Sequence, residues 1–215
     1  MNFIFDMDGV LVNSNEAHLA SWKKIASEDN VVFSDETFWK TFGMTSEYIV
    51  ETYWPKANLS QSEIAQIVER KETAFRESIP EFVNPIEGAV EFVHYLAQRG
   101  CKLAVGSSAP RINVETVLET FNLKPFFEDR VVAGDEVRNG KPAPDIFLLA
   151  AKKLCEAPEN CVVIDDSRSG VTAGKRSGAV TIGFFSSGHT IDEYENADFI
   201  VQDFNGVKKV LNLVD

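Results

Sequence analysis

The chain has 215 residues, of which 44% are hydrophobic and 25% are charged, so it can bury one large core or two smaller ones. Its formal net charge of −12 argues against nucleic acid and anionic membrane surfaces as partners, because phosphate-backbone binding depends on clustered lysine and arginine side chains. No apolar stretch is long enough to span a bilayer, no signal peptide is recognisable and the three cysteines lack metal-site spacing, so we expect a cytoplasmic protein.

The first predicted element is a buried strand that ends in two carboxylates. The apolar run 3–5 leads directly into Asp6, Met7, Asp8 and Gly9. Because alternate residues of a strand share a face, the two aspartates can converge on one site, with the carbonyl group of Met7 between them. Such oxygen atoms can hold Mg²⁺, whereas a plain turn after a core strand is the alternative. A calcium-binding EF-hand loop is disfavoured, because its glycine stands at the sixth position and Gly9 is the fourth residue from Asp6.

Residues 13–83 carry helical periodicity and no convincing strand. Helices are predicted at 14–29, 35–42, 47–53 and 60–78, with Ser14, Ser34 and Ser60 as N-caps. We expect an all-helical insert whose large aromatic side chains form its own core rather than a ligand cage. These aromatic residues are Trp22, Phe38, Trp39, Phe42, Tyr48, Tyr53 and Trp54.

From about Val83 onward, short apolar runs alternate with helical patterns. The predicted strands cover 101–106, 161–164, 180–185 and 199–201, and the predicted helices cover 85–99, 110–121, 144–154 and 169–177. Together with the opening strand, this alternation predicts an α/β domain, formed by residues 1–12 and 84–215, with a doubly wound Rossmann-like parallel sheet. The ligand site of such a sheet lies at the carboxyl ends of its strands, where Asp6 is expected.

Three further segments place polar side chains at strand ends or in a stiff loop. Ser107 and Ser108 follow a predicted strand and could receive an anion, although helix capping is the simpler interpretation. Lys141 lies in a loop flanked by prolines, where its ammonium could neutralise phosphate and a neighbouring carboxylate or merely be solvated. Asp165 and Asp166 end a second apolar strand, and a shared cation would relieve the repulsion between two acidic strand ends.

These segments, in this order, resemble the four motifs of the haloacid dehalogenase superfamily of phosphotransferases. The matching residues are Asp6-Met7-Asp8-Gly9, Ser107, Lys141 and Asp165-Asp166. The helical insert at 13–83 resembles the α-helical cap of the subgroup that contains β-phosphoglucomutase and small-metabolite phosphatases. The resemblance covers essentially the whole chain and implies a phosphotransferase fold with an inserted helical cap domain.

The resemblance also implies catalytic roles. Asp6 would be the nucleophile that attacks phosphorus to form an aspartyl-phosphate. Asp8 would protonate the leaving oxygen and later deprotonate water or a second hydroxyl group. Ser107 and Lys141 would bind the transferring phosphoryl group, whose charge must be neutralised during transfer.

The implied cofactor is Mg²⁺. Its candidate ligands are Asp6, the carbonyl of Met7, Asp8, Asp165 and Asp166. The family often has Glu-Asp at the fourth motif, so the shorter Asp165 could coordinate the metal directly or through water.

The helical insert would decide which substrate is bound. His18 and Trp22 are four residues apart and resemble residues of the phosphomutase branch, although packing in the insert's core is the alternative. Lys71 matches a cap lysine of the mutases or is a solvated helix residue. Ser46 stands where that branch carries an arginine that grips the distal phosphate, and Thr45 and Ser46 cannot replace its charge.

Two more residues are candidate substrate contacts near the strand end at 106. Ser108 follows Ser107 there, and Arg111 is the one nearby cation that could compensate for Ala109 and Pro110, which stand where the mutases carry polar phosphate-binding side chains.

We therefore predict a Mg²⁺-dependent phosphatase of small phosphorylated metabolites, such as sugar phosphates. A phosphosugar mutase similar to β-phosphoglucomutase is the alternative. A non-catalytic binding protein on the same fold is disfavoured, because both Asp6 and Asp8 are present. The expected partner is a small phosphorylated metabolite, and the expected oligomeric state is a monomer or a weak homodimer.

Overall fold

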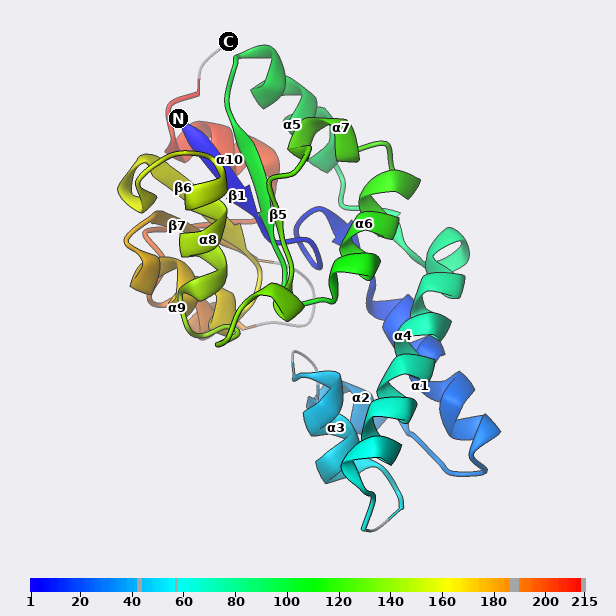
Figure 1. The fold of residues 1–215 in the computed structure, drawn as a ribbon. Coiled ribbons are helices and arrows are strands. Elements are labelled where there is room, and N and C mark those ends of the chain that lie inside the picture. The colour runs from blue at the N-terminus through cyan, green and yellow to red at the C-terminus, as the bar shows by residue number, and fades with distance from the viewer. Residues whose placement is uncertain (42–43, 57, 186–189, 214–215) are drawn as a thin grey trace. The chain divides into compact units, whose positions relative to one another are not determined.

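The computed structural model of the protein describes residues 1–41, 44–56, 58–185 and 190–213 (Figure 1). The chain forms two compact units. We call Met1–Asn13 with Asn84–Asp215 the α/β unit, and Ser14–Val83 the helical unit. The predicted boundary differs by one residue, because Asn13 pairs with Asn84 and so belongs to the α/β unit.

Six parallel strands form the main sheet of the α/β unit, in the order β5-β4-β1-β6-β7-β8. They are β1 (Asn2–Phe5), β4 (Leu103–Gly106), β5 (Val131–Val132), β6 (Cys161–Asp165), β7 (Val180–Phe184) and β8 (Phe199–Val201). From β1 the chain runs outward to β4 and β5, then returns to β6 on the other side of β1. The sheet is therefore doubly wound, as predicted, and the carboxyl ends of β4, β1 and β6 meet where such sheets bind ligands.

A separate antiparallel pair and six α-helices complete the α/β unit as far as it is described. The pair is β2 (Val12–Asn13) with β3 (Asn84–Pro85). The helices are α5 (Ala89–Gln98), α6 (Arg111–Thr120), α7 (Lys124–Phe127), α8 (Asp145–Lys153), α9 (Arg168–Ser177) and α10 (Phe204–Val210), with 3₁₀ turns at Gly134–Glu136, Pro158–Asn160 and Ile191–Tyr194. All predicted strands and helices of this unit are present, with ends shifted by at most four residues, whereas β2, β3, β5, α7 and α10 were not predicted.

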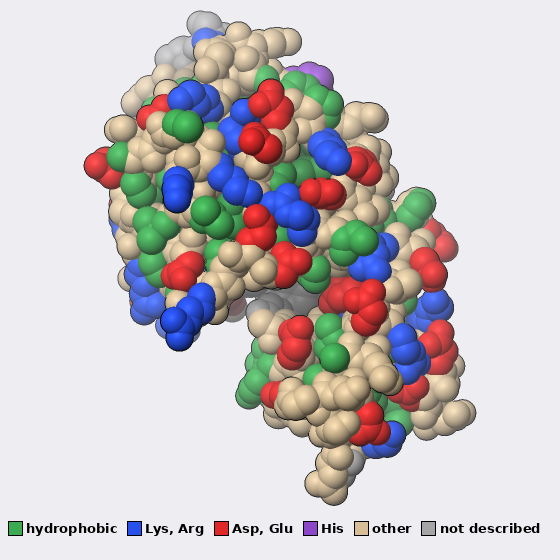
Figure 2. All heavy atoms as spheres, viewed as in Figure 1, with side chains coloured by type: hydrophobic (Ala, Val, Ile, Leu, Met, Phe, Trp, Pro, Cys, Tyr) green, Lys and Arg blue, Asp and Glu red, His purple; other side chains and the backbone are tan. Residues whose placement is uncertain are grey.

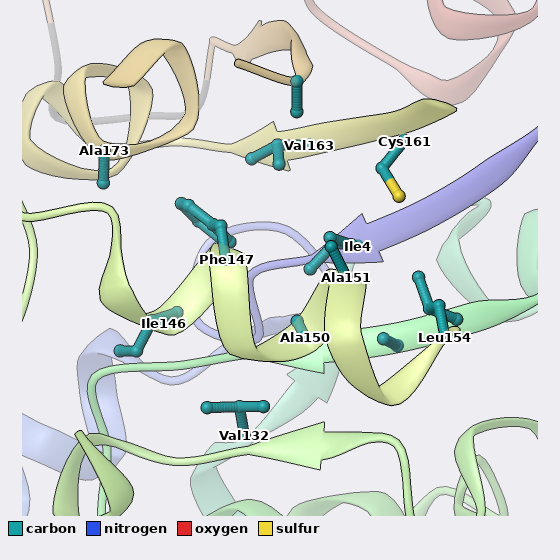
Figure 3. Close-up of a cluster of buried hydrophobic side chains, with 12 residues drawn as sticks. Ile4, Val132, Ile146, Phe147, Ala150, Ala151, Leu154, Cys161, Val163 and Ala173 are labelled. Carbon is teal, nitrogen blue, oxygen red and sulfur yellow. The ribbon is translucent and has the colours of Figure 1, made fainter. Parts of the chain in front are cut away.

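The alternation of side chains along β1 explains why helices cover both faces of the sheet. Phe3 and Phe5 lie edge-on to Phe92 of α5, with ring centroids 6.1 and 6.2 Å apart, on one face. Ile4 points to the other face, where it packs in a buried apolar cluster with Phe147 of α8 and Val163 of β6 (Figure 3). Residues of the same parity at the ends of these strands should therefore lie on the side of α8.

The helical unit contains α1 (Asn15–Glu28), α2 (Asp35–Thr41), α3 (Ser46–Tyr53) and α4 (Gln61–Phe82). The predicted aromatic core is confirmed for Trp22, Phe38 and Trp54, which are buried together, but Trp39 and Tyr48 are about half exposed. Phe42 lies outside the described residues.

The serines predicted to cap helices differ in what they do. Ser60 forms a capping box with Glu63, and the hydroxyl of Ser34 accepts a hydrogen bond from the backbone N–H of Thr37. Ser14 occupies the N-cap position of α1 without a side-chain capping bond. Over the described residues, no helix combines the length and apolar character needed to cross a membrane.

Candidate active site

A buried ion-pair network joins the ends of β1 and β6. The ammonium of Lys141 lies 2.9 Å from Asp6 Oδ2 and 2.7 Å from Asp165 Oδ2, and the Lys141 side chain is 4% exposed. The register that pairs Phe5 with Ile164 brings the two aspartates side by side. Both have the parity of the residues that face α8, and Lys141 reaches them from the loop before that helix. The structure thus places the ammonium of Lys141 against two carboxylates.

Asp166 adds a third carboxylate to this group. Oxygen atoms of Asp6, Asp165 and Asp166 lie within 4.8 Å of one another, and all three residues are buried. Gly9 makes room for this arrangement, because a Cβ atom there would lie 1.7 Å from Asp166 Oδ2. Its φ of +74° also favours glycine. The hydroxyl of Tyr194 donates to the backbone carbonyl of Asp166 at 2.6 Å and helps to fix this strand end.

The electrostatics of the group are dominated by burial and negative charge. Burial raises the pKa of Asp6 well above its ordinary value, and the neighbouring carboxylates of Asp165, Asp166 and Asp8 raise it further, while Lys141 opposes them. For Lys141, burial alone would lower the pKa, but the two carboxylates that it contacts outweigh burial and raise it. The ammonium of Lys141 is therefore a permanent charge that does not balance all of its acidic neighbours.

This donor set fits a hard divalent cation. Clustered carboxylate oxygens with surplus negative charge are what Mg²⁺ binds in proteins. A cation here would also oppose the burial and the neighbouring carboxylates that raise the pKa of Asp6. Asp8, which is half-buried, lies outside the group of three carboxylates.

Both carboxylate oxygens of Asp165 already accept hydrogen bonds. Oδ2 contacts Lys141, and Oδ1 accepts from the backbone N–H and the hydroxyl of Ser167 at 2.9 and 2.8 Å. A Cβ atom at Gly170 would lie 1.9 Å from the Asp165 carboxylate, so the helix behind it must carry glycine at this position. Asp165 is thus held in place by protein groups, which favours contact with a metal through water over direct coordination.

The prediction that the carbonyl of Met7 binds a metal does not fit the structure. This oxygen accepts hydrogen bonds from the backbone N–H groups of Leu11 at 2.9 Å and Val12 at 3.1 Å. A carbonyl oxygen has two lone pairs, and the turn after β1 uses both. Met7 therefore belongs to the structure of the turn rather than to the ligand set.

The candidate residues that follow β4 differ in burial and in hydrogen-bond partners. Ser107 is buried at the end of β4, next to β1, and its hydroxyl accepts from the backbone N–H of Ala109 at 3.1 Å. Ser108 is exposed. The guanidinium of Arg111 is bound by Glu115, by Glu136 and by the carbonyl of Val131. These contacts occupy Arg111, so we do not include it among the proposed substrate contacts.

The structure brings together most of the candidate residues of the helical unit. Lys71 Nζ lies 3.1 Å from His18 Nδ1 and 5.5 Å from the ring centroid of Trp22. Ser46 donates a hydrogen bond at 2.7 Å to Glu72, which also pairs with Lys71 at 2.9 Å. The hydroxyl of Thr45 instead caps α3, where it accepts from the N–H of Tyr48. Sequence reasoning missed Glu72.

With this geometry established, comparison with known proteins decides the family. Residues 1–178 match the family model of haloacid dehalogenase-like hydrolases. The chain belongs to this family. The predicted superfamily is thereby confirmed.

The curated relatives of this hydrolase include phosphatases. A phosphorylated carbohydrates phosphatase of Thermotoga maritima is 31% identical over 179 residues, which cover 81% of this chain and 80% of the relative. A validoxylamine A 7'-phosphate phosphatase of Streptomyces hygroscopicus is 26% identical over 95% of this chain and 94% of the relative. This chain is accordingly an enzyme of the phosphoric monoester hydrolase class.

Solved structures agree with the fold. A family IA, variant 3 hydrolase of Entamoeba histolytica superposes with a TM-score of 0.87 at 25% identity over 99% of this chain and 98% of that one. A β-phosphoglucomutase of Clostridium difficile superposes with a TM-score of 0.81 at 23% identity over 99% of this chain and 97% of that one. The second likeness extends to the fold alone.

Proposed function

We propose that this hydrolase is a Mg²⁺-dependent phosphatase of small phosphorylated metabolites, sugar phosphates in particular, and that it works through an aspartyl-phosphate on Asp6. The observation that carries the proposal is the buried group of three carboxylates at the ends of β1 and β6, with Lys141 bridging two of them. Such a group combines a nucleophile, a cation site and a fixed positive charge.

Asp6 and Asp8 would divide the bond changes between them. A carboxylate oxygen of Asp6 attacks phosphorus, a new oxygen–phosphorus bond forms, and the bond from phosphorus to the leaving oxygen breaks. Asp8 gives a proton to that leaving oxygen. In the second half, Asp8 takes a proton from water, the water oxygen attacks phosphorus, and Asp6 is released as carboxylate together with inorganic phosphate.

Lys141 and Ser107 would hold the phosphoryl oxygens during both steps. Lys141 is already aimed at Asp6 from 2.9 Å, and burial in a region shielded from water strengthens its attraction for phosphate oxygens. Ser107 lies at the end of the neighbouring strand β4 and can turn its hydroxyl toward an anion.

Asp6 and Asp166 would hold Mg²⁺, with Asp165 contributing through water. When bound, the cation supplies positive charge that offsets the carboxylates and the incoming phosphoryl group. We assign Asp8 to proton transfer rather than to the metal, because it lies outside the group of three carboxylates.

The names of the relatives support a polyhydroxyl substrate. The Thermotoga maritima enzyme is named for phosphorylated carbohydrates, and the Streptomyces enzyme is named for validoxylamine A 7'-phosphate. Each relative matches this chain over at least 80% of its own length.

The alternative, a phosphosugar mutase, finds less support. A mutase must hold a second phosphate while its bisphosphorylated intermediate reorients. Ser46 carries no charge for that purpose, and its hydroxyl is bound to Glu72. The contact between His18 and Lys71 is the observation that keeps this alternative open.

The expectations about partners and location remain proposals. On the face drawn in Figure 2, lysine and arginine side chains are interspersed with aspartate and glutamate rather than gathered into a basic patch. This distribution accords with a small-molecule substrate. A cytoplasmic location and a monomeric or weakly dimeric state are still predictions.

The proposal is tested with a panel of phosphorylated metabolites, assayed with and without Mg²⁺ for phosphate release and for isomerisation. We expect phosphate release that depends on Mg²⁺ and is fastest with sugar monophosphates. Rapid conversion of β-glucose 1-phosphate to glucose 6-phosphate, with a trace of the 1,6-bisphosphate and little free phosphate, would instead establish the mutase.

A further inference from the structure

The ammonium of Lys141 has a further neighbour besides its two carboxylates. It lies over the ring of Phe147, 5.0 Å from the ring centroid, which is within the range of a cation–π contact. The side chain of Lys141 is 4% exposed and Phe147 is fully buried, so little water screens this attraction. The ring therefore belongs to the buried surroundings of the ammonium, together with Asp6 and Asp165.

Packing in the α/β unit fixes the place of the Phe147 ring. Phe147 lies in the first turn of α8 and belongs to the buried apolar cluster that contains Ile4 and Val163 (Figure 3). The end of β4 also approaches it closely, because a Cβ atom at Gly106 would lie 3.1 Å from two carbon atoms of the ring. The ring is therefore held by the core and not by the loop that carries the lysine.

The loop before α8 is exposed at residues 138–140 and 142, yet it delivers a buried ammonium. The guanidinium of Arg176 donates to the carbonyl of Pro142 at 3.0 Å and ties this loop to α9. That bond fixes the backbone, whereas the ammonium of Lys141 lies at the end of a long flexible stem. Contacts at the ammonium itself must therefore hold it in place.

The neighbours of the ammonium differ in what the proposed reaction does to them. Asp6 would lose its negative charge when it forms the aspartyl-phosphate, and its attraction for Lys141 would then fall. Asp165 takes no part in the bond changes, and its other oxygen is held by Ser167. The ring of Phe147 takes no part in them either. Asp165 and Phe147 are therefore the two neighbours that stay constant through the reaction.

We propose that Phe147 is a positioning residue for Lys141. The face of its ring carries partial negative charge and holds the ammonium beside the phosphoryl group while Asp6 is phosphorylated. One constant contact fixes a distance but not a position, and the ring supplies the second contact. This inference rests on the proposed function, because that function assigns the phosphoryl oxygens to Lys141.

Fluorinated phenylalanines at position 147 test this role without removing the side chain. Each added fluorine atom withdraws electrons from the ring face and changes its size little, so the attraction for a cation falls stepwise. The probe is beryllium fluoride with Mg²⁺, which bonds to a carboxylate oxygen and mimics an aspartyl-phosphate. Calorimetry should show an affinity that falls stepwise, on the order of tenfold with trifluorophenylalanine, and kcat for a sugar monophosphate should fall alongside. A purely structural role predicts no dependence on the electron density of the ring.

The same series at position 92 is the matched control. Phe92 of α5 is a buried ring of the same unit that lies edge-on to Phe3 and Phe5 on the other face of the sheet. Fluorination there should leave both readouts unchanged. An equal loss in the two series would mean that fluorine in the core, and not the attraction for the ammonium, is responsible, and would overturn the inference.

A thermodynamic cycle with Lys141→Met measures the contact without any ligand. With Lys141 present, the free energy of unfolding should fall with each fluorine atom at position 147. In Lys141→Met this dependence should disappear, since no cation lies over the ring. The variant need not be active for this comparison. The same dependence in both backgrounds contradicts the cation–π contact.

Failure of the proposed function is distinguishable from failure of this inference. A wild type that releases no phosphate from the metabolite panel and does not bind beryllium fluoride refutes the proposed function. Equal affinity for beryllium fluoride along the series at position 147 refutes the role of Phe147, even where the wild type is an active phosphatase. A stepwise loss that is confined to position 147 supports this role.

Discussion

Both units of this hydrolase bury a lysine beside carboxylates, but the two lysines have different partners. Lys141 in the α/β unit contacts two aspartates, and a third carboxylate lies within 4.8 Å of those. Among the described residues, Lys71 in the helical unit pairs with the carboxylate of Glu72 and contacts the ring of His18. The first cluster has surplus negative charge, and the second is balanced.

The pKa directions of the acidic residues reflect this difference. Burial and neighbouring carboxylates raise the pKa of Asp6, whereas the partners of Glu72 overcome the effect of burial and lower its pKa. Surplus negative charge favours binding of a cation, whereas an ion pair of opposite charges needs no further counter-ion. The proposed metal and phosphate chemistry therefore belongs to the first cluster, whereas Lys71 and Glu72 offset each other's charge inside the helical unit.

The largest effect should come from Asp6→Asn, which keeps the shape of the nucleophile but removes its negative charge. Phosphate release should fall on the order of 10⁴-fold or more, because no aspartyl-phosphate can form. Steady-state assays with a sugar monophosphate measure the loss, and circular dichroism checks the fold. Activity comparable to the wild type in a folded variant would rule out covalent catalysis by Asp6.

Asp8→Asn should have the next largest effect, since it removes the proposed proton donor. We expect a loss on the order of 10²–10⁴-fold with a sugar phosphate. An aryl phosphate has a leaving group that needs less protonation, so its loss should be smaller. The ratio of the two losses is the measurement, and equal losses would contradict the role of Asp8.

In the balanced cluster, the main expected effect is on stability. Glu72→Ala leaves the ammonium of Lys71 buried without its counter-charge, so the free energy of unfolding should fall by about 3–5 kcal/mol. Urea unfolding measures this change. Glu77→Ala, which breaks an exposed pair on the same helix, should change it little. If the two variants behaved alike, Glu72 would not be the buried counter-charge that we describe.

The stabilising effect of Glu72 should also depend on pH in a defined direction. The pKa of Glu72 in the folded protein lies below its ordinary value of 4.5, so its ionised form stabilises the folded state above that pH. This stabilisation is lost as the pH falls through the lower, folded pKa. The stability difference between the wild type and Glu72→Gln should be full near neutral pH and shrink in acid. A difference that stays constant would contradict the ion pair.

Tyr194→Phe should give the smallest effect. It removes the hydroxyl that donates to the carbonyl of Asp166, at a cost of about 1 kcal/mol in stability. Tyr95→Phe is the control, because the hydroxyl of Tyr95 donates to the carbonyl of Leu213 near the C-terminus. A larger loss of Mg²⁺ affinity in Tyr194→Phe than in Tyr95→Phe would tie this bond to the first cluster.

The sheet and the first cluster were largely predictable from sequence, because both depend on local patterns. Apolar runs that end in acids mark where buried strands emerge, and parallel strands bring such ends together. For this reason the close approach of Asp6 and Asp165 could be predicted, and Lys141 could be picked out by its proline-flanked loop. Strand β5 has only two residues, which is too short to produce a recognisable pattern.

The balanced cluster and the turn after β1 depend on contacts that sequence spacing does not reveal. Glu72 follows Lys71 directly on a helix, and adjacent helix residues ordinarily point apart, so their pairing could not be expected. The carbonyl of Met7 is used by the N–H groups of Leu11 and Val12, which only the three-dimensional turn shows. The pairing of Arg111 with Glu136, 25 residues along the chain, likewise depends on the three-dimensional fold.

Calorimetric titration with Mg²⁺ tests the contrast between the two clusters most directly. The account predicts that the wild type and Glu72→Gln bind one Mg²⁺ with equal affinity, and that Asp166→Asn weakens this binding by at least about tenfold. Absence of binding to the wild type, or binding that survives Asp166→Asn but is lost with Glu72→Gln, would contradict it.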